Sequence, residues 1–420
     1  MTGTSVSAAW APDTAMAPSG AETDLPADRQ PVIIAARRSP VCRANGKLKD
    51  LRAHQLLAPV LRQLLTDAHL GPDAVADVVI GNAVGAGGNV ARLALLEAGL
   101  PVTVPGVTVD RQCGSGLDAI VLAAKLVAAG GNAVYLAGGV ESISTAPLRA
   151  YRNDDGGPDF FARAQFVPLS YGDPDMGVAA ENVAAYFGIG RSRQDALALL
   201  SHQRALAAAA AGRFNDEITP LETRSGTVGA DDGPRRGLNA SVLARFPAAF
   251  VDGGTVTAGN SCFDADAASA VVITSLARAR ELGAADGLLV VATDTAGVDP
   301  ELLGIGAADA AHRLLAAADV PAADVDLVEF NEAFASQTLA CLDRLGIDAG
   351  RVNADGGALA LGHAYGASGA VLVTRLLAQA RRAGKQQSLA LALISIAGGM
   401  GTAALLRYEA ITDRAATSRR

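Results

Sequence analysis

The sequence predicts an α/β protein made of two similar halves, and three observations lead to this prediction. Short, continuously apolar runs alternate with stretches of helical periodicity, which is typical of a buried parallel or mixed sheet. Half of the 420 residues are hydrophobic but only 4% are aromatic, so aliphatic side chains and 46 glycines dominate the apolar content. The order strand, glycine-serine-glycine-type turn, helix, strand, paired glycines occurs twice, which indicates an internal duplication.

The first half begins near Pro31 and contains four apolar runs that are short enough to be strands. These runs are Val32–Ala36, Val78–Ile80, Val107–Val109 and Ala133–Ala137. Apolar residues at helical spacing predict helices at Leu51–Ala68 and Leu117–Ala129. The glycines at 138 and 139 are expected to end the fourth strand.

The chain changes in texture between about residues 142 and 255, which we interpret as an inserted lobe. Tyr151–Asp175 is rich in Gly, Asp, Pro and aromatic residues and has no clear period. A helix is predicted over Ser192–Ala211, with Ser192 as its N-cap and Asp195 completing a capping box. Apolar strand character returns at Ala268–Ile273.

The last part of the chain repeats the plan of the first. Strands are predicted at Asp326–Phe330 and Leu389–Ser395, and helices at Asn331–Leu345 and Ala370–Ala383. A glycine-rich turn ending in Gly366–Gly369 precedes the second of these helices. Because two like halves place equivalent loops face to face, we expect a cleft between them.

The expected organisation has four parts. They are a disordered tail (1–30), an N-terminal half (31–142 with 256–278), an inserted loop domain (143–255) and a C-terminal half (279–420). The first residues lack the basic start and apolar core of a signal peptide. Two uncharged stretches near the C-terminus are interrupted by glycines, so we interpret them as core elements rather than membrane spans. We therefore expect a cytoplasmic protein without membrane partners.

Charge and composition argue against two further classes of function. The formal net charge is −8, which disfavours a nucleic-acid-binding protein. The four cysteines have neither disulfide-framework nor zinc spacing, and the five histidines form no HxH or HxxxH cluster. We therefore expect no metal site.

Cys113 is the first candidate for chemistry. It lies between a predicted strand and the start of a helix, and Gly114 and Gly116 follow it closely. A helix N-terminus lowers the pKa of a nearby thiol and so enriches the nucleophilic thiolate. The alternative is an inert, buried cysteine, and position alone does not decide between the two.

Three further segments supply candidate partners for this thiol. His363 lies in a glycine-rich turn; a neutral imidazole can take a proton from a thiol, but the residue could equally be a satisfied core histidine. Asn331 and Glu332 follow a strand directly. Asn331 could hold a water molecule or donate to an oxyanion and Glu332 could orient a base, or Asn331 could simply cap the next helix. The turn 395–401 exposes backbone N–H groups at a strand end, as an oxyanion hole requires.

Taken together, these segments resemble the thiolase family. The matching motifs are Val109–Leu117, Gly138–Ser142, Met176-Gly177 with Ala180–Asn182, Arg193–Asp195, Gly254–Asn260, Asn331–Ala335 (NEAFA) and Gly356–Gly369. The resemblance covers about residues 31–408 in the family's order. It implies a thiolase-like fold with two αβαβαββ halves, a five-layered αβαβα core and an inserted loop domain. It also implies coenzyme A thioester substrates, no bound cofactor, and a homodimer or homotetramer.

The resemblance also implies roles for individual residues. Cys113 would be the acylated nucleophile, and His363 would activate it. His363 and a water molecule held by Asn331 would form one oxyanion hole, and the backbone N–H groups of Cys113 and Ala397 would form a second. The residues expected to border the substrate are Met176, Ser261, Cys262, Phe263 and Ala364.

The sequence departs from the family at several of these positions. The last family motif, Cys-x-Gly, here reads Ser395-Ile396-Ala397, so the cysteine that deprotonates the second acyl-CoA is replaced by a serine, a poor base. Ser261–Asp266 (SCFDAD) stands where the family reads close to ASGIND, and Ala364 replaces a proline. We expect Phe263 and the acidic Tyr151–Asp175 to alter how coenzyme A is held.

Three functions remain open at this point. The favoured one is acyl transfer from a coenzyme A thioester through Cys113 with carbon–carbon bond formation, in which Ser395 is a weak relay or decarboxylation of a malonyl-type partner supplies the enolate. The second is acyl transfer to an oxygen or nitrogen nucleophile, which needs no carbanion. The third is a non-catalytic thiolase-like partner subunit. A carrier-bound acyl group is an alternative donor.

Overall fold

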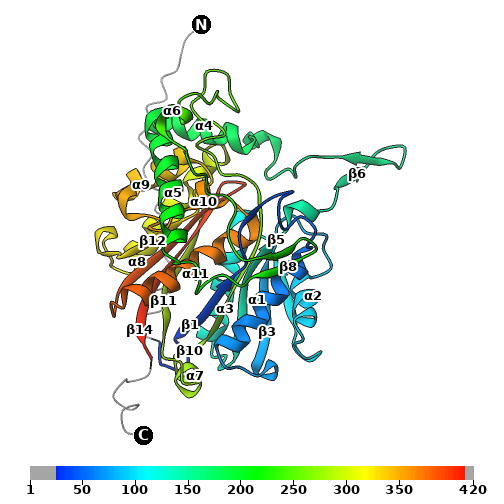
Figure 1. The fold of residues 1–420 in the computed structure, drawn as a ribbon, viewed down its shortest axis with the longest axis vertical. Coiled ribbons are helices and arrows are strands. Elements are labelled where there is room, and N and C mark those ends of the chain that lie inside the picture. Colours follow the sequence, from blue (N-terminus) through cyan, green and yellow to red (C-terminus); the bar gives the residue numbers. More distant parts are fainter. Residues whose placement is uncertain (1–24, 412–420) are drawn as a thin grey trace.

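The structure is a computed structural model that describes residues 25–411 (Figure 1), so most of the expected tail (1–30) lies outside the described residues. The first half supplies strands β1 (Pro31–Arg38), β3 (Val75–Gly81), β4 (Gly106–Val109), β5 (Val134–Glu141) and β10 (Ala265–Ser275). The second half supplies strands β11 (Asp286–Gly297), β12 (Leu327–Phe330), β13 (Leu389–Ile396) and β14 (Met400–Ala410).

Six helices cover these strands in the same order in each half. They are α1 (Ala53–Asp67), α2 (Val90–Glu97) and α3 (Ser115–Ala128), followed by α8 (Gly306–Ala317), α9 (Ala335–Leu345) and α11 (Tyr365–Ala383). The short elements β2 (Cys42–Arg43), α7 (Leu276–Glu281) and α10 (Ala358–Leu361) lie in the connections between them.

The strands form one mixed sheet whose two ends mirror each other. Its order is β12-β13-β14-β11-β1-β10-β5-β3-β4, with β2 paired to β10. The two halves meet where β1 pairs with β11, through Val32 with Leu289 and Ile33 with Leu288. At the far end, Val352 forms an isolated parallel bridge with Val328 of β12. Val352 thus takes the position beside β12 that β4 takes beside β3 in the first half. The predicted duplication is therefore visible in the topology.

Alternation of side chains along the strands produces five layers. In β3, Val78 and Ile80 pack with α1 and α2, whereas Val79 packs with α3 and α11. In β13, Ala392 also packs with α3 and α11, whereas Leu391 packs with α8 and α9. The order helix, strand, helix, strand, helix is the αβαβα arrangement that the family resemblance implied. Burial of both strand faces explains the continuously apolar runs.

Glycines allow the first turns of α3 and α11 to approach each other closely. A Cβ atom on Gly116 would lie 2.5 Å from the carbonyl oxygen of Gly366, and one on Gly369 would lie 2.6 Å from the backbone nitrogen of Leu117. A Cβ on Gly139 would lie 1.8 Å from the same Gly366 oxygen. These contacts exclude any side chain at the three positions. They bring together the two loops that precede α3 and α11.

Four boundaries differ from those predicted. β5 continues through the glycines at 138 and 139, because these glycines make room for α11 instead of ending the strand. α5 (Arg191–Ala210) begins after Gly190, and Asp195 accepts hydrogen bonds from Arg191 and Asn260 instead of capping. α9 begins after Phe334, so the prediction that Asn331 begins or caps this helix is wrong. α11 begins at Tyr365, because its early glycines hide the helical pattern.

The segment between β5 and β10 has two recognisable parts. The strands β6 (Ala150–Arg152) and β7 (Pro158–Phe160) form a hairpin arm that extends away from the body (Figure 1). The helices α4 (Met176–Phe187) and α5 pack against α9 and α10 of the second half. A small hairpin, β8 (Leu221–Thr223) with β9 (Gly226–Val228), and α6 (Ala240–Leu243) complete it. A separate loop domain at 143–255 stays a prediction.

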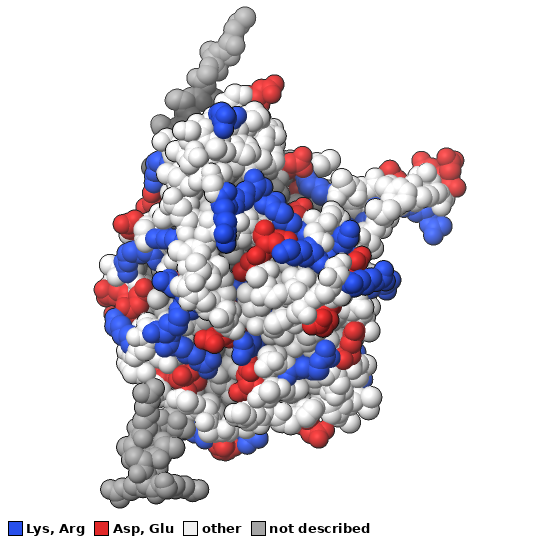
Figure 2. Space-filling model, in the orientation of Figure 1, with Lys and Arg blue, Asp and Glu red and all other residues white. Residues whose placement is uncertain are grey.

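Surface charge and helix hydrophobicity bear on the expectations about nucleic acids and membranes. Figure 2 shows basic and acidic side chains interspersed over the face that it displays. Within residues 25–411, no helix is long and apolar enough to cross a membrane.

Candidate active site

One cavity brings the candidate residues of the two halves together. Its volume is about 900 Å³. Cys113 lines it from the turn before α3, His363 from the turn before α11, and Ser395 and Ala397 from the end of β13. Met176, Ser261 and Cys262 also lie in its wall. The close packing of α3 on α11 places these two turns beside each other.

The turn that carries Cys113 is fixed by local hydrogen bonds. The hydroxyl of Ser115 donates to the carbonyl of Gln112 (2.6 Å) and accepts from the backbone N–H of Arg111 (2.8 Å). Gln112 has a φ of 46°, and its N–H donates to the Asp110 carboxylate. A Cβ on Gly114 would lie 2.3 Å from the Cδ1 of Ile396, so this glycine lets the end of β13 approach the thiol.

The protonation state of Cys113 differs from the sequence-based expectation. Burial raises the pKa of its thiol to about 12, whereas the backbone N–H groups of Ala397 and of Cys113 itself act in the opposite direction. Desolvation of a thiolate therefore outweighs the stabilising effect of the helix N-terminus. The resting group is a thiol that needs a base to become a nucleophile. The same two N–H groups are those that the resemblance assigned to the second oxyanion hole.

His363 lies in the wall of the same cavity and has the protonation state that a base requires. Burial lowers the pKa of its imidazole to about 4, so the ring is neutral at physiological pH. Its Nδ1 lies 2.7 Å from the hydroxyl of Ser368, and its buried Nε2 has no hydrogen-bond partner within the described part of the chain. When Nδ1 carries the proton, Nε2 is a free acceptor.

Ser368 is a site residue that sequence reasoning missed. Its hydroxyl contacts His363 and also accepts the backbone N–H of Ala364 (3.1 Å). The residue lies in the first turn of α11, five residues after the histidine, and its motif was recognised without a role for the serine. The position of a hydroxyl in the first helical turn after the histidine was the available signal.

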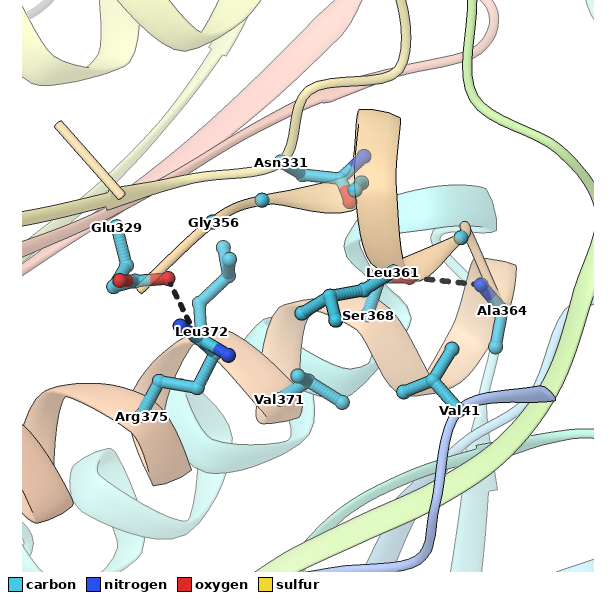
Figure 3. Close-up of a pocket in the computed structure, with 13 residues that line it drawn as sticks. Val41, Glu329, Asn331, Gly356, Leu361, Ala364, Ser368, Val371, Leu372 and Arg375 are labelled. Carbon is cyan, nitrogen blue, oxygen red and sulfur yellow. Dashed lines mark hydrogen bonds and ion pairs between the residues drawn. The ribbon is translucent and has the colours of Figure 1, made fainter. Parts of the chain in front are cut away.

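Asn331 lies beside a second, much smaller cavity (Figure 3). Its volume is about 20 Å³, enough for one water molecule, and Asn331, Ala364 and Ser368 are in its wall. The side-chain Nδ2 of Asn331 is buried and has no partner among residues 25–411. An unsatisfied amide beside a water-sized space is what the predicted Asn331-held water requires.

The hydroxyl of Ser395 is fully engaged by its surroundings. It donates to the carbonyl oxygen of Gly304 at 2.6 Å. It accepts the backbone N–H of Ala307 at 3.2 Å and the side-chain amide of Gln337 at 3.4 Å. A serine has a single hydroxyl hydrogen, and here a buried carbonyl takes it. This geometry suits a structural role more than a relay to substrate.

Two of the five predicted substrate-border residues lie outside the main cavity. The Arg43 guanidinium lies over the Phe263 ring, with its central carbon 3.7 Å from the ring centroid. The ring also packs against a buried cluster that includes Ala364. Ala364 is 1% exposed and lines only the small cavity. Neither residue lines the main cavity, and a place for them at the border of the substrate stays a prediction. Cys262 lines the main cavity, but burial raises the pKa of its thiol.

The inserted segment contributes apolar walls that the sequence did not indicate. Phe160, Phe161 and Phe250 line the cavity from the arm and from the loop before β10. The acidic character of the segment 151–175 is partly offset, because Arg163 pairs with Asp173 (3.0 Å) and Asp175 (2.6 Å). These ion pairs reduce the repulsion that the segment would exert on the phosphates of coenzyme A.

Two buried carboxylates hold the loops of the site. Glu141 accepts backbone N–H groups from Ala83 (2.9 Å), Val84 (3.2 Å) and Gly366 (3.0 Å), and burial raises its pKa to about 7. It thus ties the end of β5 to the start of α11. Glu332 accepts from Ser201, Asn353 and the N–H of Leu359, and it is turned away from the main cavity.

The sequence analysis expected no metal site, and the placement of possible ligands bears on this expectation. Within the part of the chain that the structure describes, no group of three or more His, Cys, Asp or Glu side chains is placed to hold a metal ion.

Comparison with known proteins identifies relatives over most of the chain. The family model described as "Thiolase, N-terminal domain" matches residues 31–277, and that described as "Thiolase, C-terminal domain" matches 288–408. "Putative acetyl-CoA C-acetyltransferase VraB" of Staphylococcus epidermidis is 42% identical over 381 residues, covering 90% of this chain and 98% of that protein. "Putative acetyl-CoA C-acetyltransferase YhfS" of Bacillus subtilis is also 42% identical, covering 90% and 99%.

A solved structure gives the same result for the fold. The crystal structure of the Bacillus anthracis acetyl-CoA acetyltransferase superposes with a TM-score of 0.82 at 34% identity, covering 90% of this chain and 99% of that one. The two family models together match more than half of the chain. The protein therefore belongs to the thiolase family and is an acyltransferase.

Proposed function

We propose that the protein transfers an acyl group from a coenzyme A thioester to Cys113 and then joins it to a second acyl thioester in a Claisen-type condensation. One observation carries the proposal: the Cys113 thiol and the His363 imidazole, with its free Nε2, line one cavity of about 900 Å³. The names of the relatives, acetyl-CoA C-acetyltransferases, support the same reaction class.

The first half-reaction follows from the protonation states. Cys113 is a thiol with a raised pKa, and His363 is a neutral base with a lowered one. Nε2 takes the thiol proton as sulfur attacks the thioester carbonyl, and the resulting imidazolium protonates the departing coenzyme A thiolate. Burial disfavours a standing ion pair, so charge develops only during the reaction.

Two sets of donors can stabilise the developing oxyanion. The backbone N–H groups of Cys113 and Ala397 both act to lower the pKa of the Cys113 thiol, so they are close enough to serve an acyl group attached to its sulfur. A water molecule in the small cavity would link Asn331 to the other side of the site. Oxyanion donors of this kind contribute about 2.7–4 kcal/mol each to transition-state stabilisation.

The second half-reaction needs a carbanion on the acceptor thioester. The Ser395 hydroxyl already donates to Gly304 and accepts from Ala307. It could take a proton from the substrate only if one of these buried hydrogen bonds were broken. Decarboxylation of a malonyl-type acceptor would supply the enolate without a base. The same observation favours, as a second candidate, transfer to an oxygen or nitrogen nucleophile.

Product analysis separates these reactions. The purified protein is incubated with acetyl-CoA alone, with acetyl-CoA and malonyl-CoA, and with acetyl-CoA and a panel of alcohols and amines. Condensation yields a 3-oxoacyl-CoA and free coenzyme A, whereas the second candidate yields an ester or amide. An ester or amide without any carbon–carbon product would contradict the proposal, and so would an unaltered product pattern in a Cys113→Ala variant.

We also propose that the protein acts as a homodimer or homotetramer. The arm and the segments on either side of it expose several large apolar side chains: Leu148, Tyr151, Phe160, Leu169 and Tyr171. Several exposed apolar groups in one part of the chain are typical of an interface. Sedimentation analysis of the wild-type protein would show a monomer if this proposal is wrong.

A further inference from the structure

The engaged hydroxyl of Ser395 leaves the condensation without an evident base, but the cavity wall holds several other titratable side chains. Cys113 and His363 serve the first half-reaction, and burial raises the pKa of the Cys262 thiol, which therefore stays protonated and cannot accept a further proton. Asp175 is held by Arg163. Asp264 and Tyr365 remain, and both line the cavity.

Asp264 is fixed directly beside His363. The two residues form an isolated parallel β-bridge, in which the N–H of His363 donates to the carbonyl of Phe263 (2.9 Å) and the N–H of Ala265 donates to the carbonyl of His363 (3.2 Å). Residues paired in this way project their side chains to the same side of the backbone. The Asp264 carboxylate therefore lies on the same side as the catalytic imidazole.

Tyr365 holds this carboxylate in place. Its hydroxyl donates to Oδ1 of Asp264 at 2.7 Å, and its ring lies 5.2 Å from the His363 ring in an edge-on contact. Burial, together with the charge of Asp264 and the hydrogen bond to it, raises the pKa of Tyr365, so its hydroxyl stays a donor. Asp264 makes no ion pair with a lysine or arginine among residues 25–411, which leaves Oδ2 available to a ligand.

Asp264 and Ser395 lie in the wall of the same cavity but differ in what they offer to a substrate. The Ser395 hydroxyl is engaged by three partners, whereas Oδ1 of Asp264 accepts a single hydrogen bond.

We infer that Asp264 is the acid/base of the carbon–carbon bond-forming step, positioned by Tyr365, and this inference rests on the proposed function. Asp264 removes the α-proton of the acceptor thioester, and the electron pair of that C–H bond attacks the acyl carbonyl carbon on Cys113. The C–C bond forms as the C–S bond to Cys113 breaks. Asp264 then returns its proton to the Cys113 thiolate, so the 3-oxoacyl thioester leaves and the enzyme is restored.

Separate measurement of the two half-reactions tests this assignment. Acylation of Cys113 is followed by intact mass, with acetyl-CoA and then longer straight-chain acyl-CoAs as donors. The α-proton step is followed by deuterium incorporation into the same thioester in D₂O, together with the rate of 3-oxoacyl-CoA formation. Asp264→Asn should acylate within about threefold of the wild-type rate, and its exchange and condensation should fall by about 100-fold or more.

Matched variants control for indirect effects. Asp73→Asn changes an exposed aspartate outside the cavity and should leave both half-reactions unaltered. Tyr365→Phe removes only the positioning hydroxyl, so kcat for exchange should fall by about tenfold while KM for the acceptor stays the same. Tyr186→Phe, at an exposed tyrosine, should change neither constant.

Several results would overturn the inference. Deuterium exchange at the wild-type rate in Asp264→Asn would contradict it. A raised KM with an unchanged kcat in the same variant would also contradict it, because that result indicates a binding role. A larger loss of exchange in Ser395→Ala than in Asp264→Asn would return the role to Ser395. If the wild type never acylates, or acylates and yields only esters or amides, the proposed function fails too. Equal rates of condensation in the wild type and in Asp264→Asn would contradict this inference but leave the proposed function intact.

Discussion

Replacing Ser368 by alanine should slow the acylation of Cys113 while leaving its thiol in place. The Ser368 hydroxyl lies 2.7 Å from Nδ1 of His363 and accepts the N–H of Ala364 at 3.1 Å. His363 and Ser368 are 4% and 6% exposed, so water replaces the lost partner poorly. The variant leaves the imidazole free to adopt the other tautomer, in which Nε2 carries the proton and no longer acts as a base.

The magnitude follows from the cost of an unpaired buried group. Such a group costs about 1–3 kcal/mol. If that cost falls on the transition state of acylation, the rate constant decreases by about 5- to 150-fold, since about 1.4 kcal/mol corresponds to a factor of ten. The rate is measured by mixing enzyme with acyl-CoA, quenching in acid, and following the acylated mass over time.

Two controls make this result specific. Ser368→Thr retains the hydroxyl and should acylate close to the wild-type rate. Ser225→Ala removes an exposed serine hydroxyl and should have no effect. Acylation by a folded Ser368→Ala variant within about twofold of the wild type would refute the view that this hydrogen bond orients the base.

Three further predictions concern pH and packing. Because burial lowers the pKa of His363 to about 4, acylation should stay level from pH 8 to about 6 and fall with a midpoint near 4 as the base is protonated; a midpoint near 6.5, the ordinary histidine value, would contradict this. Gly139→Ala should destabilise the protein by about 1–3 kcal/mol or more in urea denaturation, since its Cβ would lie 1.8 Å from a carbonyl oxygen, whereas Gly71→Ala, with open space around it, should be nearly neutral. Ser395→Ala should cost about 1–3 kcal/mol of stability, because Gly304 and Ala307 lose their partner; an unchanged urea midpoint would show that the hydroxyl is not structural.

The layered fold could be predicted because its strands carry continuous apolar runs and its two halves share one plan. Helix starts were predicted less well where glycines interrupt the pattern. α11 begins at Tyr365, yet Gly366 and Gly369 in its first turns read as a loop. The glycine at 139 was read as a strand end, although it serves a close approach to α11 from a residue more than 200 positions later. Contacts of that kind have no local signature in the sequence.

The candidate site could be predicted in its composition but not in its electrostatics. Cys113, His363, Ser395 and Ala397 meet in one cavity, as the motif order suggested. Position next to a helix start suggested a lowered thiol pKa, but burial, which depends on the whole fold, raises it. The direction of the Phe263 ring and the hydrogen bonds around Ser395 likewise depend on residues from other parts of the chain.

The central claim is that Cys113 carries the acyl group during turnover. Intact-mass measurement after mixing the protein with a panel of acyl-CoAs tests it most directly. The account predicts a gain of one acyl group in the wild type, localised to the peptide that contains Cys113, and no gain in Cys113→Ala. Acylation that persists in Cys113→Ala, or no acylation of a wild-type protein whose thiol still reacts with iodoacetamide, would contradict it.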